Sequence, residues 1–150
     1  MSTTYQQIVD KVEARMKTIL ILNGYLTNTG LNVYISRNVP IGPKVQYGLN
    51  IKDGPETIDD KGVSGPNGVW NRAMTLKLVF EAAESTTTDT LLRNAWTDAL
   101  KAIGTDPTWS GLAILTRAVP GEPADDQDER EIMSETMELQ IEFRTERWTE

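Results

Sequence analysis

The chain has 150 residues, a formal net charge of -7, and neither cysteine nor histidine. The missing cysteines exclude disulfides and thiolate zinc sites, and the missing histidines exclude a Ser-His-Asp triad and the commonest general base. The negative charge argues against a dedicated nucleic-acid binder, because phosphate contacts dominate nucleic-acid affinity.

A single soluble domain spanning residues 1–150 is the expected organisation. Hydrophobic residues make up 39% of the sequence, which is enough to bury a core. The N-terminal stretch MSTTYQQIVDK lacks the charged and apolar regions of a signal peptide, and the longest aliphatic run, residues 19–22, is too short to span a bilayer. We therefore expect an intracellular protein.

The first half of the chain predicts one helix and two short strands. Apolar residues recur at three- and four-residue steps over 5–20, the stretch TTYQQ at 3–7 offers two alternative capping boxes, and Asn23-Gly24 predicts a left-handed end to the helix. The strands are expected at 33–37 and 47–51, separated by the turn signal IGPK.

The stretch from 53 to 68, DGPETIDDKGVSGPNG, differs in composition from its surroundings. It holds four glycines and two prolines and has no apolar periodicity. Loops of this length are usually functional or disordered. We therefore expect a long flexible hairpin loop at about 53–68.

The second half of the chain predicts three strands and a helix. A long strand is expected at about 69–82, and the capping residues at 85–89 introduce a helix that Gly104 ends, with Trp96 on its apolar stripe. Further strands are expected at 112–119, after Trp109, and at about 134–144. In the last strand, apolar and polar residues alternate strictly, which is typical of a strand with one buried face.

This order of elements predicts an α+β fold class. The strands on either side of the long loop are expected to form one hairpin, and the last two strands another. A mostly antiparallel β-sheet with both α-helices packed on one face is the simplest architecture, since strict alternation requires one face to be covered and the other open.

Three motifs bear on catalytic or binding chemistry. The acidic segment PGEPADDQDERE at 120–131 places Arg130 where a calcium loop needs a ligand or a tight turn. GVSGPNG lacks the spacing of a phosphate loop and precedes a strand instead of a helix. Glu138 and Glu142 lie on the polar face of a strand, where carboxylates are usually solvated. We therefore expect no enzyme, no metal site and no cofactor.

Tryptophan and arginine cluster at two places where contacts with other proteins are expected. Trp70 and Arg72 follow the long loop, while Arg144, Arg147 and Trp148 lie at or beyond the end of the last strand. Both residue types are enriched at protein interfaces, so these five residues are candidates for a subunit or tube interface. The alternative is that the Trp70/Arg72 and Arg147/Trp148 pairs fold back over an end of the sheet.

The stretch from Ala73 to Trp148 resembles the tail terminator, or tail-completion, proteins of long-tailed bacteriophages. The features that carry the resemblance are an amphipathic helix after a long strand, the loop GTDPTWSGLA, a strand ending near AVPGEP and a closing strand of the type LQIEFRT. The helix and loop of the N-terminal half fit the layout of that family.

The resemblance implies a structural virion protein. Such proteins pack helices against an antiparallel sheet and form a homo-hexameric ring on the finished tail tube. The ring ends polymerisation of the tube, provides the surface for head attachment and lets DNA pass without specific binding. The implied partners are further copies of the chain, the tube protein and head–tail connector or neck proteins. The implied location is the head-proximal end of the virion tail, and the host cytoplasm during assembly.

The acidic segment has an expected role within such a ring. Asp125, Asp126, Asp128 and Glu129 are candidates to line the bore, where negative charge would repel DNA and let it slide. Three other functions remain open at this point: another connector or neck protein, a tail tube subunit that polymerises into open cylinders, or a small-molecule binding module that uses a cleft between helices and sheet.

Overall fold

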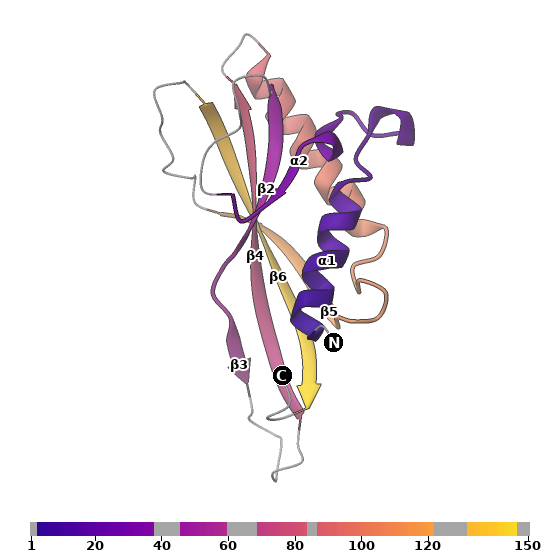
Figure 1. Cartoon of the computed structure of the whole chain (residues 1–150), viewed down its shortest axis with the longest axis vertical. Helices are drawn as coiled ribbons and strands as arrows, with labels where there is room; N and C mark the ends of the chain where they lie inside the picture. The colour runs from indigo at the N-terminus through magenta and orange to yellow at the C-terminus, as the bar shows by residue number, and fades with distance from the viewer. Residues whose placement is uncertain (1–2, 38–45, 60–68, 84–86, 122–131, 147–150) are drawn as a thin grey trace.

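In a computed structural model of the chain, two helices cover one face of a single sheet (Figure 1). The structure describes residues 3–37, 46–59, 69–83, 87–121 and 132–146. The helical elements in these ranges are α1 (Thr4–Met16), the 3-10 turns η1 (Ile21–Asn23) and η2 (Thr29–Leu31), and α2 (Thr88–Gly104). The strands are β1 (Val33–Ile35), β2 (Tyr47–Asp53), β3 (Thr57–Asp59), β4 (Val69–Ala83), β5 (Leu115–Pro120) and β6 (Ile132–Glu146).

The sheet has the strand order β1-β2-β4-β6-β5, and β3 pairs with β4 outside this path. Only the β1–β2 pair is parallel among the described strands, and the other pairs are antiparallel. The predicted α+β fold is confirmed, with its mostly antiparallel sheet, its hairpin-like pairing of β2 with β4 and its pairing of β5 with β6.

The antiparallel pair β4–β6 runs the length of the molecule (Figure 1). Its register extends from Val69 opposite Glu146 to Ala83 opposite Ile132. Apolar side chains on one face of both strands are fully buried beneath the helices, and they alternate with polar side chains on the open face. The buried residues of this face include Met74, Leu76, Leu78, Met137, Leu139, Ile141 and Phe143.

Helix α1 begins as predicted but ends earlier. The side chain of Thr3 accepts a hydrogen bond from the backbone N–H of Gln6, which caps the first turn. The predicted end at Asn23-Gly24 is wrong, because the helix ends at Met16 and the left-handed Gly24 closes the separate turn η1. Ile19 reaches the core from the non-helical linker between them, where its carbonyl accepts a hydrogen bond from Gly30. Its helical spacing therefore misled the prediction.

The expected loop at about 53–68 contains a strand. β3 pairs its residues Thr57, Ile58 and Asp59 with Ala73, Arg72 and Asn71 of β4. Three residues give too short a signal to detect among glycines and prolines, and the pairing depends on a strand distant in sequence. Residues 60–68 lie outside the described ranges.

The remaining predicted elements are confirmed with shifted ends. Strand β5 begins three residues later than expected, because Gly111 adopts a positive φ of 83° and the chain is still turning there. Strand β6 is longer than predicted, and α2 ends at Gly104 as expected. Neither helix in the described ranges is long and apolar enough to cross a membrane.

We predict that Gly30→Ala destabilises the chain while Gly104→Ala does not. A Cβ atom at Gly30 would collide with the backbone of Lys17 and lie 2.9 Å from the carbonyl oxygen of Ile19. Such overpacking costs about 1–3 kcal/mol or more. A Cβ atom at Gly104 meets nothing within 4 Å, so that variant should have equal or slightly higher stability. Urea unfolding of both variants measures the difference, and equal free energies of unfolding would contradict the prediction.

Candidate assembly surfaces

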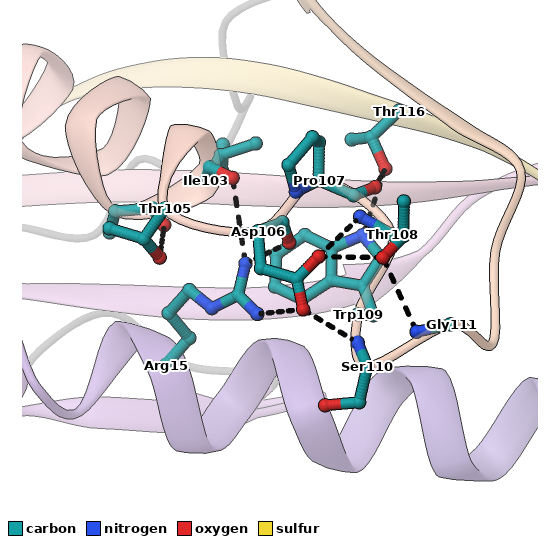
Figure 2. A network of polar contacts seen from close by, with 11 residues as sticks. Arg15, Ile103, Thr105, Asp106, Pro107, Thr108, Trp109, Ser110, Gly111 and Thr116 are labelled. Carbon is teal, nitrogen blue, oxygen red and sulfur yellow. Dashed lines mark hydrogen bonds and ion pairs between the residues drawn. The ribbon is translucent and has the colours of Figure 1, made fainter.

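The loop between α2 and β5 is organised by the side chain of Asp106 (Figure 2). One carboxylate oxygen accepts hydrogen bonds from the backbone N–H and the hydroxyl of Thr108, at 3.0 and 2.6 Å, and the other accepts from the N–H of Ser110 at 2.8 Å. These hydrogen bonds, first the one from the Thr108 hydroxyl, lower the pKa of Asp106 to about 2. The carboxylate therefore stabilises the turn in its charged form.

Arg15 joins this loop to α1 (Figure 2). Its guanidinium lies 3.7 Å from the Asp106 carboxylate, donates to the backbone carbonyls of Asp106 and Ile103, and sits 4.1 Å from the centre of the Trp109 ring. Burial lowers the pKa of Arg15, an effect that the neighbouring Asp106 opposes. One arginine thus holds α1, the end of α2 and the following loop together.

Trp109 is fully buried and anchors the same loop in the core. Its indole N–H donates to the hydroxyl of Thr116 at 2.8 Å, and that hydroxyl donates to the carbonyl of Pro107 at 2.6 Å. Trp109 and Ser110 both adopt positive φ angles, 53° and 62°, which are costly for residues other than glycine. The burial of Trp109 and the hydrogen bonds of Asp106 offset this cost, so the loop GTDPTWSGLA acts as a rigid anchor.

A second surface is the end of the long strand pair β4–β6, where both strands extend past the start of α1 (Figure 1). We call residues 69–73 of β4 and 142–146 of β6 the arm. Trp70 and Arg72 are opposite Thr145 and Phe143, on the face that α1 covers farther along the β4–β6 pair. Arg144 is opposite Asn71 and therefore lies on the open face. The structure places these predicted interface residues on opposite faces of the arm.

Arg72 is engaged within the chain. Its Nε lies 2.5 Å from the carboxylate of Glu56, and its guanidinium carbon lies 4.9 Å from the centre of the Phe143 ring. The Phe143 ring in turn contacts Tyr5 of α1 edge-on, with 6.4 Å between ring centres. One nitrogen, Nη1, is buried and has no hydrogen-bond partner among the described residues. Arg72 therefore fixes the arm to its neighbours, whereas Arg144 is exposed and donates a hydrogen bond to Asn71.

The other predicted site residues cannot be placed. Arg147 and Trp148 lie outside the described residues, as do Asp125, Asp126, Asp128 and Glu129. Within the described ranges, no group of three or more acidic residues is arranged to hold a metal ion.

A third surface, which the sequence analysis missed, is the segment from 20 to 31 that follows α1. We call it the apolar loop. It stands away from the sheet in the indigo part of the chain at the right of Figure 1. Four aliphatic side chains on it are exposed to solvent: Ile21 by 56%, Leu22 by 84%, Leu26 by 57% and Leu31 by 69%. Their position among Asn, Gly and Thr residues was the available signal, but the expected helix, with its end at Asn23-Gly24, covered the first residues of the segment.

Asp98 of α2 holds the apolar loop in place. Its buried carboxylate accepts hydrogen bonds from the N–H groups of Leu26 and Thr27, at 2.9 and 2.8 Å, and from the Thr27 hydroxyl at 2.6 Å. Lys101, one turn further along α2, donates to the carbonyl of Gly24 at 3.1 Å. The loop backbone is thus fixed by hydrogen bonds to α2, of which those from Thr27 are buried, and its aliphatic side chains are exposed.

A groove of about 430 Å³ lies where β5 leaves the side of β6. Helix α2 provides one wall, and the residues around Pro120 and the first part of β6 provide the other. The groove is lined by Arg93, Trp96, Thr97, Pro120, Gly121, Ser134, Glu135 and Thr136. The Thr136 hydroxyl is buried without a hydrogen-bond partner in the described structure.

We predict that Arg72→Ala lowers the free energy of unfolding by about 1–3 kcal/mol, because it removes a hydrogen bond between charged groups and a ring contact. The matched variant Arg144→Ala should change it by less than about 0.5 kcal/mol, as is usual for exposed sites. Urea unfolding at low protein concentration measures both. A larger loss for Arg144→Ala than for Arg72→Ala would show that the assignment of internal and external roles is wrong.

We also predict a pH-dependent contribution from Asp106. Its pKa of about 2 in the folded chain lies below the ordinary value of 3.8, so the carboxylate stabilises the fold above about pH 4. This contribution is lost as the pH falls from about 4 towards 2. The stability difference between the unmodified chain and Asp106→Asn should therefore shrink between pH 6 and pH 3 in urea unfolding. A constant difference over that range would refute the assignment.

Comparison with known proteins gives no family for this chain: no protein-family model matches it, and no curated protein does. The resemblance to tail terminator proteins therefore rests on the sequence pattern described above. The other observations that bear on function are the exposed surfaces of the fold, chiefly the arm and the apolar loop.

Proposed function

We propose that this chain is a structural virion protein that caps the phage tail tube as a ring. In this role it ends tube polymerisation and forms the surface to which the head attaches. The apolar loop is the observation that carries the proposal. Exposed aliphatic side chains on a backbone fixed by buried hydrogen bonds mark a contact surface for another protein. Assembly therefore accounts for this feature better than catalysis does.

A ring subunit needs two different surfaces that complement each other, since a closed ring is built from head-to-tail contacts. The apolar loop and the arm are two such unlike surfaces, one aliphatic and one carrying tryptophan and arginine. We assign the arm, with Trp70 and Arg144, to contact with the tube or a neighbouring subunit. Arg72 positions this arm through Glu56 and Phe143.

The overall charge suits a channel that DNA crosses. A ring of chains that each carry a net charge of -7 repels the phosphate backbone, so DNA is not held by sequence-independent contacts. The proposed partners are therefore further copies of the chain, the tube protein and connector or neck proteins. The proposed location is the head-proximal end of the tail.

The groove beside Trp96 favours a second candidate function, a small-molecule binding module. Its volume of about 430 Å³ falls in the range of ligand sites, about 300–1,000 Å³. Such a module would not affect tube growth. A tube subunit would form open cylinders on its own, and a connector would bind a finished neck without stopping polymerisation.

The test adds the purified chain to tail tube protein while it polymerises, and measures tube length by electron microscopy. We expect growth to stop and one end of each tube to carry a cap. Unchanged tube lengths would contradict the proposal, and cylinders made of this chain alone would identify a tube subunit.

A matched pair of variants tests the role of the apolar loop. Leu22→Asp combined with Leu31→Asp should raise the concentration needed for capping at least about tenfold, because burying one leucine contributes about 1.5–3 kcal/mol. Ala14→Asp, on the exposed side of α1, should leave capping unchanged. Equal capping by both variants, with equal urea midpoints, would show that the apolar loop is not the contact surface.

A further inference from the structure

A depression lies on the open face of the sheet, where β3, β4, β6 and β5 are side by side. The register there joins Thr57 to Ala73, Ala73 to Glu142, and Glu142 to Leu115. Ala73 and Glu142 adjoin residues of the row that is buried beneath the helices, so their own side chains lie on the opposite face. We call this depression of about 250 Å³ the sheet hollow. Its lining includes Thr57, Ala73, Thr75, Leu115, Arg117 and Glu142.

The sheet hollow combines small side chains with exposed aliphatic ones. Ala73 and Thr75 lie next to each other on the open face of β4, and Thr57 is opposite Ala73 on β3. Leu115, at the start of β5, is 39% exposed. A second depression, of about 330 Å³, continues the hollow past Ile114, which is 53% exposed. The result is a concave and partly apolar surface that is open to solvent.

The sheet hollow and the apolar loop both lack an excess of negative charge, although the chain has a net charge of -7. In the hollow and its continuation, Arg117, Glu142 and Arg144 are exposed, and none of them forms an ion pair with a described residue. The apolar loop, residues 20–31, contains no charged residue. Because copies of an acidic chain repel each other, they come together most readily through surfaces of this kind.

The apolar loop and the sheet hollow lie on opposite sides of the sheet. Hydrogen bonds to Asp98 and from Lys101 hold the loop against α2, which packs on the helix-covered face. On that same face, the hydroxyl of Tyr47 accepts a hydrogen bond from the N–H of Asn28. Since the sheet separates the two surfaces within one chain, a contact between them requires two chains.

We infer that the apolar loop of one copy packs into the sheet hollow of the next copy, with Leu22 and Leu26 against Ala73 and Leu115. The loop projects from the molecule on a fixed backbone, and the hollow is its concave counterpart. The occupant of the hollow is a second copy of this chain. A different protein bound to the loop would leave the hollow open, whereas a neighbouring copy covers both exposed apolar surfaces.

This contact has the symmetry that a ring requires. The two joined surfaces differ, so the contact is head-to-tail, which is the type that closes into rings. Leu22, 84% exposed, is the expected anchor, because side chains that fill a pocket on the partner contribute most to binding. The inference deepens the proposed function by naming the contact between ring neighbours, and it rests on that function for its biological role.

The absence of cysteine allows a direct test by engineered thiols, since the only thiols will be those introduced. Leu22→Cys combined with Leu115→Cys places one thiol on each surface, at positions that are exposed in the single chain. Mild oxidation traps the contact covalently even where the association is weak. We expect a ladder of dimers, trimers and larger species that reductant reverses.

Single-cysteine and remote-pair variants provide the controls. Asp10→Cys with Leu115→Cys puts the first thiol on the exposed side of α1. It should give at least about tenfold less cross-linking, because no contact raises the effective concentration of the two thiols. Efficient dimers from Leu22→Cys or Leu115→Cys alone would overturn the inference in favour of contacts between like surfaces. No ladder above the level of the remote pair would also overturn it.

Filling the hollow shows whether its shape makes the contact. In the double-cysteine chain, Ala73→Trp occupies the hollow and should lower the cross-linking rate at least about tenfold, because the anchor side chain loses its pocket. Ala14→Trp makes the same change on the exposed side of α1 and should preserve the rate. Urea midpoints verify folding, and Thr57→Trp, at an exposed position of β3, replaces Ala73→Trp where the latter does not fold. Equal rates for the filled and control variants would overturn the inference.

The tube-capping assay separates this inference from the proposed function. Capping without any cross-linked ladder would mean that the ring forms through another contact. A ladder without capping would keep the contact between copies and remove the proposed role on the tail tube.

Discussion

The register between β4 and β6 is the constraint on which the rest of the structure depends. Each strand has fifteen residues, and they pair along their whole length. A slip of one residue would turn the buried row of Met74, Leu76 and Leu78 outward, so the register is fixed by the burial of one face. Both helices, the β2 and β5 pairings and the arm are positioned by this pair of strands.

Charged side chains fix the segments whose position is not set by the burial of apolar residues. Arg15 and Asp106 join α1 to the loop before β5, and Asp98 holds the apolar loop against α2. Arg72 performs the same task for the arm through Glu56. In each case, a charged group with several partners fixes the position of backbone that would otherwise have few contacts.

Under the proposed function, these internal attachments prepare the surfaces for assembly. An exposed leucine such as Leu22 on a fixed backbone loses little conformational freedom when a partner covers it, so less of the binding free energy is spent on ordering. If the proposed function holds, the fold is organised in advance for contacts between chains.

Much of the fold followed from the sequence, because its signals were local. Strict alternation over 134–144 predicted a half-buried strand, and the stripe containing Trp96 predicted α2. Elements that depend on distant partners were missed or misplaced. β3 exists through its pairing with Ala73, Arg72 and Asn71, and Ile19, counted as helical, is buried from a linker.

The candidate site residues divide in the same way. The sequence alone determined that Trp70, Arg72 and Arg144 lie near strand ends and that no cysteine or histidine chemistry is available. Only the tertiary structure decided that Arg72 bonds to Glu56 while Arg144 faces out, and that the apolar loop is exposed. Periodicity reports which face of an element is apolar, whereas partners and exposed edges are set by contacts between segments far apart in the chain.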